Sequence, residues 1–275
     1  MFKISFYIRK KPAIDASEFR DYWLGEHAEL QRQYVEKLGV RSLIKCEVLP
    51  DDLTGQATMA AYGTSGELYD FVDHWVFNDI EDLKKGYDNP EVRQTMQAVY
   101  ASEDRYIDSH RSNIAMSVDL PQFYPVEEYR AKPGNGIVKI YYCARCLPEL
   151  TREQAQLHWN ACHGAVSRQD IRYSALSKYV QAHTIDSTFV DEMVDLRNYL
   201  VEPCFIGHAE AWLDTKAPPK DIPEEETAEV VAMSMDDIDL FTDKHSSQVF
   251  AAQEHFIIDK PVITRPMPKF FSAVY

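Results

Sequence analysis

Hydrophobic and polar residues alternate at the start of the chain and again near its middle. Residues 2–8 place a phenylalanine or an isoleucine at every even position, with Lys3, Ser5 and Tyr7 between them. A period of two puts alternate side chains on opposite faces of a strand. Residues 138–145 repeat the pattern. We therefore expect two strands with one apolar face each.

A helix with an apolar stripe is predicted after each of these strands. Asp15 with Glu18, and Thr151 with Gln154, have the spacing of capping boxes at helix starts. Beyond both caps, aromatic and apolar residues recur at steps of three and four, which predicts a face packed on a sheet. The stripes are Phe19, Tyr22, Trp23, His27, Leu30 and Tyr34, and Ala155, His158, Trp159, His163 and Val166.

Each half is expected to continue with two short strands, a longer helical region and a last strand. In both halves the helical region is predicted to end at an aspartate, Asp108 or Asp259, which we interpret as a turn cap, with Asp259 kept as a minor site candidate. The predicted strands are 42–49, 57–64 and 112–118 in the first half, and 177–184, 205–213 and 269–275 in the second.

The two halves are also similar residue by residue. An ungapped offset aligns Lys3 with Lys139, Ile4 with Ile140, Arg9 with Arg145, Pro12 with Pro148, Trp23 with Trp159 and His27 with His163. The offset is 136 residues, much longer than the period of a solenoid repeat, and therefore indicates duplicated domains. We place the two domains at residues 1–120 and 136–275, with a linker at 121–135. The predicted order βαββαβ is the ferredoxin-like arrangement, an α+β fold. Two such antiparallel sheets, packed face to face, would enclose one α+β barrel.

Composition and charge exclude several classes of protein. With 29 Lys and Arg against 44 Asp and Glu, the net charge is −15, which disfavours nucleic acid as a partner. We see neither a signal peptide nor the roughly 20 apolar residues of a membrane span, so we expect a cytoplasmic protein with no membrane partner. Five cysteines in a chain of 275 residues are typical of reduced thiols rather than a disulfide framework.

Residues 18–27, Glu-Phe-Arg-Asp-Tyr-Trp-Leu-Gly-Glu-His, resemble the EthD-type family of the dimeric α+β barrel superfamily. The Trp-x-x-x-His pair recurs at 159–163, and residues 179–183 and 254–259 also resemble later family segments. The resemblance implies a pocket for an aromatic compound, since superfamily members include cofactor-free monooxygenases, isomerases, cyclases, decarboxylases and dehydratases. Others bind haem or have no assigned activity. Members usually form the barrel from two chains, so a homodimer is one possible oligomeric state of this protein.

Four histidines are candidates for acid/base catalysis: His163, His208, His183 and His27. Imidazole can accept or donate a proton near neutral pH. The alternative is a core histidine that hydrogen bonds a carbonyl group. Tyr22 of the first half becomes His158 in the second, and Phe19 becomes Ala155. This divergence favours one working pocket, in the second half.

Three predicted strands of the second half carry polar or aromatic residues along one face. These faces are Lys139, Tyr141 and Cys143; Tyr179, Gln181 and His183; and His208, Glu210 and Trp212. We expect them to line one cavity, with His208 or His183 as the acid/base, Glu210 as its orienting partner and Lys139 against a substrate carboxylate. Trp159 and Tyr7 complete the substrate-binding candidates. The alternative is a solvated sheet face.

Cys143, Cys146, His158 and His163 approximate the spacing of a zinc finger. Alternation places the two cysteines on opposite faces of a strand, and the first half has no equivalent ligands. We therefore predict no metal. Glycine-rich phosphate loops, Gly-x-Ser-x-Gly elbows and His-Glu-x-x-His helices are also missing from the sequence.

The leading hypothesis is a cofactor-independent lyase or isomerase, of the decarboxylase or dehydratase type. Its substrate would be an aromatic or phenolic small molecule, and a histidine would move the proton. One alternative is haem or oxygen chemistry with His163 or His208 as the iron ligand. Another is a non-catalytic protein whose cavity binds a hydrophobic compound.

Overall fold

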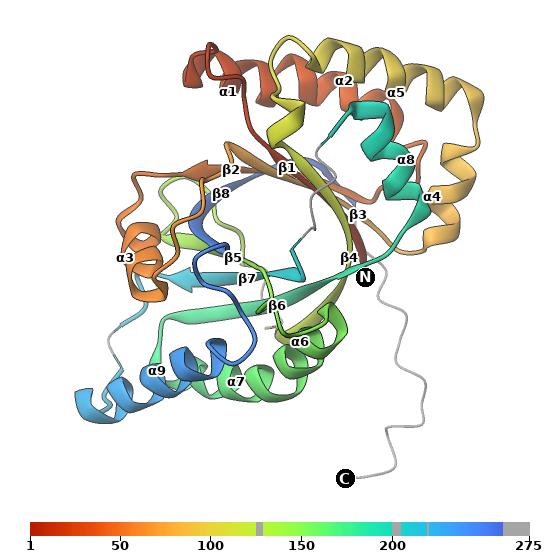
Figure 1. Cartoon of the computed structure of the whole chain (residues 1–275). Coiled ribbons are helices and arrows are strands. Elements are labelled where there is room, and N and C mark those ends of the chain that lie inside the picture. Colours follow the sequence, from red (N-terminus) through yellow and green to blue (C-terminus); the bar gives the residue numbers. More distant parts are fainter. Residues whose placement is uncertain (125–128, 200–204, 219, 261–275) are drawn as a thin grey trace.

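Eight antiparallel strands close into one barrel in the order β1-β3-β2-β8-β5-β7-β6-β4 in the computed structural model of the chain (Figure 1). The structure describes residues 1–124, 129–199, 205–218 and 220–260. The strands are β1 (Phe2–Ile8), β2 (Ser42–Leu49), β3 (Phe71–Phe77), β4 (Asn113–Phe123), β5 (Ile137–Ala144), β6 (Leu176–Ile185), β7 (Gly207–Asp214) and β8 (Gln248–Asp259).

The two halves of the chain have the same strand order. In the first half β1 lies between β3 and β4, and in the second β5 lies between β7 and β8. Edge strands then join the halves, through the pairs β2–β8 and β4–β6. The expected mixture of helices with an antiparallel barrel is confirmed, but hydrogen-bonded edges, rather than two sheets stacked face to face, close the barrel.

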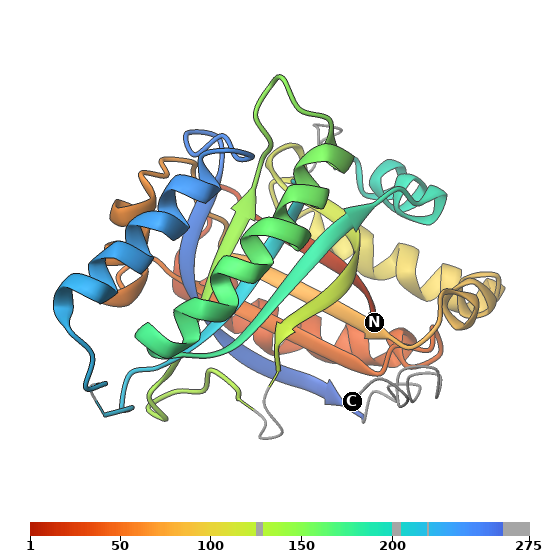
Figure 2. The ribbon, with the colours of Figure 1, turned by 90° about the horizontal axis from the view of Figure 1, so that it is seen from below.

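Helices surround the barrel on its outside (Figures 1 and 2). Figure 1 shows α1, α2, α4, α5 and α8 gathered on one side, and α6, α7 and α9 on another. Although α8 belongs to the second half of the sequence, its Phe189 packs against Tyr87 of α4, with ring centres 4.4 Å apart. The helices are α1 (Ala16–Leu24), α2 (Glu26–Val35), α3 (Leu53–Tyr62), α4 (Ile80–Tyr87), α5 (Pro90–Glu103), η1 (Ser109–Arg111), α6 (Arg152–His158), η2 (Trp159–His163), α7 (Gly164–Tyr173), α8 (Thr188–Arg197) and α9 (Glu224–Ile238).

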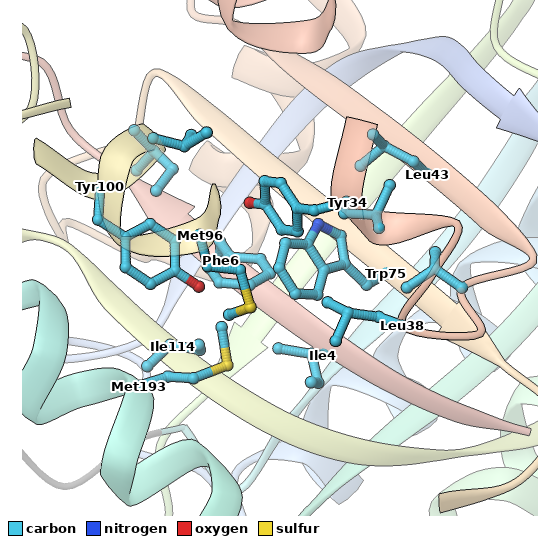
Figure 3. Close-up of a cluster of buried hydrophobic side chains, with 14 of the residues drawn as sticks. Ile4, Phe6, Tyr34, Leu38, Leu43, Trp75, Met96, Tyr100, Ile114 and Met193 are labelled. Atoms are coloured by element: carbon cyan, nitrogen blue, oxygen red, sulfur yellow. The ribbon is translucent and has the colours of Figure 1, made fainter. Parts of the chain in front are cut away.

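The largest hydrophobic cluster lies between the first-half strands and their helices (Figure 3). The alternate residues Ile4 and Phe6 of β1 point into it and meet Trp75 of β3, whose ring centre is 4.7 Å from that of Phe6. Tyr34 of α2 and Met193 of α8 enclose the same cluster. Because one face of β1 packs on helices, Lys3, Ser5 and Tyr7 face the barrel interior.

Both predicted helix starts are confirmed. The Asp15 carboxylate accepts hydrogen bonds from the backbone N–H groups of Ser17 and Glu18, and Thr151 forms a complete capping box with Gln154. The predicted first helix is divided at Gly25 into α1 and α2. Its stripe nevertheless faces the sheet, since five of the six members are buried.

One predicted strand of the first half is wrong. Residues 57–64 lie in helix α3 and the turn after it, because Asp52 caps the start of α3 and Gly63 ends it with a left-handed backbone of φ 66°. The third strand is β3, which the prediction missed. Every residue of β3 is buried. Apolar residues occupy both faces of β3, and the adjacent Asp73 and His74 interrupt its apolar run, so the strand shows no alternation.

The end of the second half also differs from the prediction. Residues 248–259 form strand β8 rather than a helix, and the predicted strand 269–275 lies outside the described residues. Asp259 therefore ends a strand, where it pairs with Arg130 at 2.8 Å, while Asp108 precedes the short helix η1. Strand β4 runs to Phe123, three residues into the predicted linker.

Candidate functional site

Strand register decides which of the predicted site residues face the barrel interior. On β5 and β7, Tyr141 lies opposite Glu210, so both point the same way. On β6, however, Val180 lies opposite Glu210. The prediction that all three strand faces line one cavity is therefore wrong for the face on β6. Lys139, Tyr141, Cys143, His208, Glu210 and Trp212 face the interior, whereas Tyr179, Gln181 and His183 face the helices.

Glu210 is the centre of a buried charge network inside the barrel. The ammonium group of Lys3 contacts one of its carboxylate oxygens, and that of Lys139 lies 2.8 Å from the other. Asp119 also pairs with Lys3, at 2.9 Å, and Glu254 with Lys139, at 3.0 Å. Burial by itself raises the pKa of Glu210, but the two lysines outweigh burial and hold the pKa well below its usual range. Glu210 is therefore ionised.

Two histidines in the interior are fully hydrogen bonded. His208 Nδ1 lies 2.9 Å from the Tyr7 hydroxyl, across the barrel, and its Nε2 lies 3.0 Å from Glu210. His74 is bonded through Nδ1 to Ser5, at 2.9 Å, and through Nε2 to the Tyr141 hydroxyl, at 2.7 Å. Burial lowers the pKa of both histidines, so both are neutral at pH 7. Neither has a ring nitrogen free for a substrate.

The described residues contain one group whose donor atoms are close enough to share a metal ion, namely His74, His208 and Glu210, with all donor atoms within 4.8 Å. Both oxygens of Glu210 already pair with lysines, and those positive charges oppose a divalent cation.

The cysteine and histidine set with zinc-finger spacing does not converge. Cys143 is buried in the cluster inside the barrel, whereas Cys146 contacts the carbonyl oxygen of Leu150. His158 and His163 lie outside the barrel and bond Asp237 instead.

A second space lies outside the barrel, between the second-half strands and the helices α7 and α9. This outer cavity has a volume of about 350 Å³. Figure 2 shows the α6–α7 stretch, in green, lying across the strands. Its polar lining includes His163 and four tyrosines, Tyr62, Tyr142, Tyr173 and Tyr179. Most of the remaining lining is apolar: Ala61, Ile140, Leu176, Ala209, Ala211, Leu213, Val230, Val231, Met235, Ile238 and Val249.

His163 is the titratable group best placed to act in the outer cavity. It ends η2, a π-helical turn of the kind often found at functional sites. Its Nδ1 lies 2.8 Å from a carboxylate oxygen of Asp237 on α9, and the second oxygen lies 2.9 Å from His158. Its Nε2 has no hydrogen-bond partner among the described residues. Burial lowers the pKa of His163, and the bond to Asp237 opposes this only in part.

The equivalent histidine of the first half is enclosed. His27 stacks on Trp23 with ring centres 3.7 Å apart, and its Nε2 lies 2.7 Å from Glu103. The ammonium of Lys45 lies 3.1 Å from its Nδ1. With both nitrogens occupied and no exposed surface, His27 is a core histidine, the alternative considered from the sequence.

The remaining candidates on β6 support the wall behind His163. The indole N–H of Trp159 donates to the Tyr179 hydroxyl at 3.2 Å, and Gln181 donates to the Trp159 carbonyl at 3.1 Å. His183 stacks on Trp159, with ring centres 5.1 Å apart. Of these four residues, only Tyr179 lines the outer cavity.

Several residues of both spaces were missed from the sequence. His74 was missed because strand β3, which carries it, was not predicted. Glu254 was missed because the residues of strand β8 were predicted to form a helix. Asp119 follows the predicted end of its strand. Asp237 is one of many acidic residues on a helix, and no sequence signal separates it from a solvated carboxylate.

Comparison with known proteins supports the resemblance stated from the sequence. Among solved structures, the crystal structure of a putative chlorite dismutase aligns over 92% of this chain and 94% of its own, with 8% identity and a TM-score of 0.44. Likeness at this level carries no information on activity. No curated protein matches the sequence. No described helix has the length and apolar character needed to cross a membrane. Residues 11–110, within the first half of the chain, match the model of the EthD domain.

Proposed function

We propose that the chain is a cofactor-independent enzyme that moves a proton on an aromatic or phenolic small molecule in the outer cavity, as a lyase or isomerase of the decarboxylase or dehydratase type. One observation carries the proposal. The Nδ1 of His163 is held by Asp237, while its unpartnered ring nitrogen belongs to a side chain that lines a mainly apolar cavity.

Asp237 gives His163 the tautomer that a general base requires. A carboxylate at Nδ1 favours the proton on that nitrogen, which leaves Nε2 with its lone pair for the substrate. Once Nε2 has taken a proton, the same carboxylate stabilises the imidazolium. Because burial lowers the pKa of His163, the neutral base predominates at pH 7.

The cavity suits a flat apolar substrate. A volume of about 350 Å³ lies within the range of small-molecule sites. Tyrosine rings provide aromatic contact surface, and a phenolic hydroxyl can donate to a developing phenolate or carboxylate. In the proposed reaction, His163 removes a proton from the substrate or returns one to its carbon, and a tyrosine of the lining stabilises the negative charge.

A haem does not fit either candidate histidine. The described residues that line the outer cavity include no lysine or arginine to pair with the two haem carboxylates beside His163. Both nitrogens of His208 are occupied by Tyr7 and Glu210. Because His208 is bonded to both Tyr7 and Glu210, we propose that it holds these two side chains in position inside the barrel.

The test is a screen of aromatic acids and phenols for binding and turnover, followed by variants. His163→Ala is expected to lower kcat by about 10²–10⁴-fold, the contribution typical of a general base. Asp237→Asn should also lower kcat and shift the acid limb of the pH–rate profile. His183→Gln is the matched control, since His183 is a buried histidine of the same half outside the cavity.

Two outcomes would contradict the proposal. Full turnover in His163→Ala would show that another group moves the proton. Tight binding of an aromatic compound to wild type and His163→Ala alike, without turnover in either, would favour the non-catalytic binding protein instead.

The equal strand orders of the two halves support a further part of the proposal, that they are copies of one ferredoxin-like unit. The boundaries at 1–120 and 136–275 and the homodimer remain predictions. Sedimentation of the purified chain measures the oligomeric state.

A further inference from the structure

The interior of the barrel opens into a cavity that the proposed function does not use. It has a volume of about 580 Å³, and its lining includes four lysines, Lys3, Lys139, Lys178 and Lys260, of which Lys260 pairs with Glu36 at 3.1 Å. Trp212 forms part of its wall, and its indole N–H is fixed by a hydrogen bond of 3.0 Å to Glu254. The cavity therefore combines amino groups with a rigid aromatic surface.

One of these lysines has no carboxylate partner. Lys3 and Lys139 each pair with two carboxylates of the network described above. Within the described part of the chain, Lys178 forms neither a hydrogen bond nor an ion pair. Its Nζ lies 3.9 Å from the ring centre of Trp212 and 4.5 Å from that of Tyr124. All three hydrogens and, after deprotonation, the lone pair are thus available to a ligand.

The surroundings of Lys178 favour its neutral amine. Burial lowers its pKa to about 8, and the positive charge of Lys139 adds to this effect. At pH 7 roughly a tenth of Lys178 is unprotonated, far more than of a lysine with the ordinary pKa near 10.4. Desolvation and a neighbouring cation are the two means by which proteins activate a nucleophilic lysine.

We propose that Lys178 is a nucleophilic amine that captures a small aldehyde or ketone with a flat apolar body as an imine inside the barrel. Its position on β6, opposite Trp212, fixes the amine beside the aromatic wall. A carbonyl compound is uncharged, so the carboxylates of Asp119, Glu210 and Glu254 do not repel it.

The step balances without an oxidant or a metal. The lone pair of Nζ attacks the carbonyl carbon, a C–N bond forms, and the carbonyl oxygen takes a proton to give a carbinolamine. The nitrogen loses one proton at this stage. The hydroxyl then gains a proton and leaves as water, the C=N bond forms, and the nitrogen gives up its second proton to leave the neutral imine. The buried carboxylates and water are the groups available to relay these protons.

Reductive trapping tests the proposal directly. The full-length protein at pH 7 is treated with limiting benzaldehyde and sodium cyanoborohydride, which converts an imine into a stable benzylamine, and the labelled lysines are identified by peptide mass spectrometry. We expect Lys178 to be labelled about tenfold faster than exposed lysines such as Lys37. Lys3 and Lys139 should stay unlabelled, since the neighbouring acidic groups raise the pKa of both despite burial.

Two variants complete the experiment. Lys178→Arg keeps the positive charge over Trp212 but forms no imine, so the fast label should disappear while the circular dichroism spectrum is unchanged. Lys37→Arg is the matched control and should keep the fast label. Labelling of Lys178 no faster than Lys37, or a fast label that persists in Lys178→Arg, would overturn the proposal. His163→Ala should leave the label intact, which separates this site from the outer cavity.

Discussion

Replacing Glu210 by glutamine removes the negative charge on which the interior network is centred. Glu210 is almost fully buried and pairs with Lys3 and Lys139 at once. Breaking a buried ion pair by removing one partner costs about 3–5 kcal/mol, because the other charge is left uncompensated. Lys3 retains Asp119 and Lys139 retains Glu254, so we expect the lower end, about 3 kcal/mol of unfolding free energy.

Urea unfolding at several pH values is the appropriate assay. The folded pKa of Glu210 lies well below its ordinary value of 4.5. Its stabilising contribution is therefore complete above that value and is lost as the pH falls toward the folded pKa. Glu210→Gln should remove this part of the pH dependence, so the wild type and the variant should converge in stability at low pH.

Glu81→Gln provides the control. Glu81 also pairs with a lysine, Lys84, at 3.0 Å, but its side chain is 61% exposed. A surface pair of this kind contributes less than about 0.5 kcal/mol. An equal loss of stability in the two variants, or a loss for Glu210→Gln that does not depend on pH, would refute the assignment of Glu210 as the centre of a buried charge network.

Two further substitutions test the packing and capping described above. Thr151→Ala removes the capping box at the start of α6 and should cost about 1 kcal/mol in urea unfolding, whereas Arg152→Lys, which leaves the cap intact, should cost less. Trp75→Ala empties the centre of the cluster in Figure 3 and should cost about 4 kcal/mol, with loss of near-ultraviolet circular dichroism; a cost under 1 kcal/mol would contradict its place in the core.

Local sequence patterns predicted the elements whose two faces differ. The alternation in 2–8 and 138–145 predicted β1 and β5, and the capping residues predicted where α1 and α6 begin. These patterns work because one face of each strand or helix packs on apolar residues and the other carries mainly polar ones, so the difference between the faces is recorded in the element's own residues. The Trp-x-x-x-His motif likewise identified the EthD resemblance and drew attention to His163.

The sequence carried less information on strands that are covered on both sides. β3 is buried throughout, and the first five residues of β8 are buried as well, so apolar residues occupy both faces and neither strand shows simple alternation. Their polar residues, His74 and Glu254, became visible as parts of the interior only when the barrel closed.

The division of the predicted site into two spaces depended on tertiary structure. Alternation shows that Tyr179, Gln181 and His183 share a face, but it does not say which face points inward. Pairing decides this, since β6 meets β7 with Val180 opposite Glu210 and with a register shift between Leu176 and Lys178. The partnership of His163 with Asp237 arises in the same way, from the packing of α9 against η2. The sequence by itself therefore determined which residues act together within one element, whereas contacts between elements distant in the chain decided where their chemistry is located.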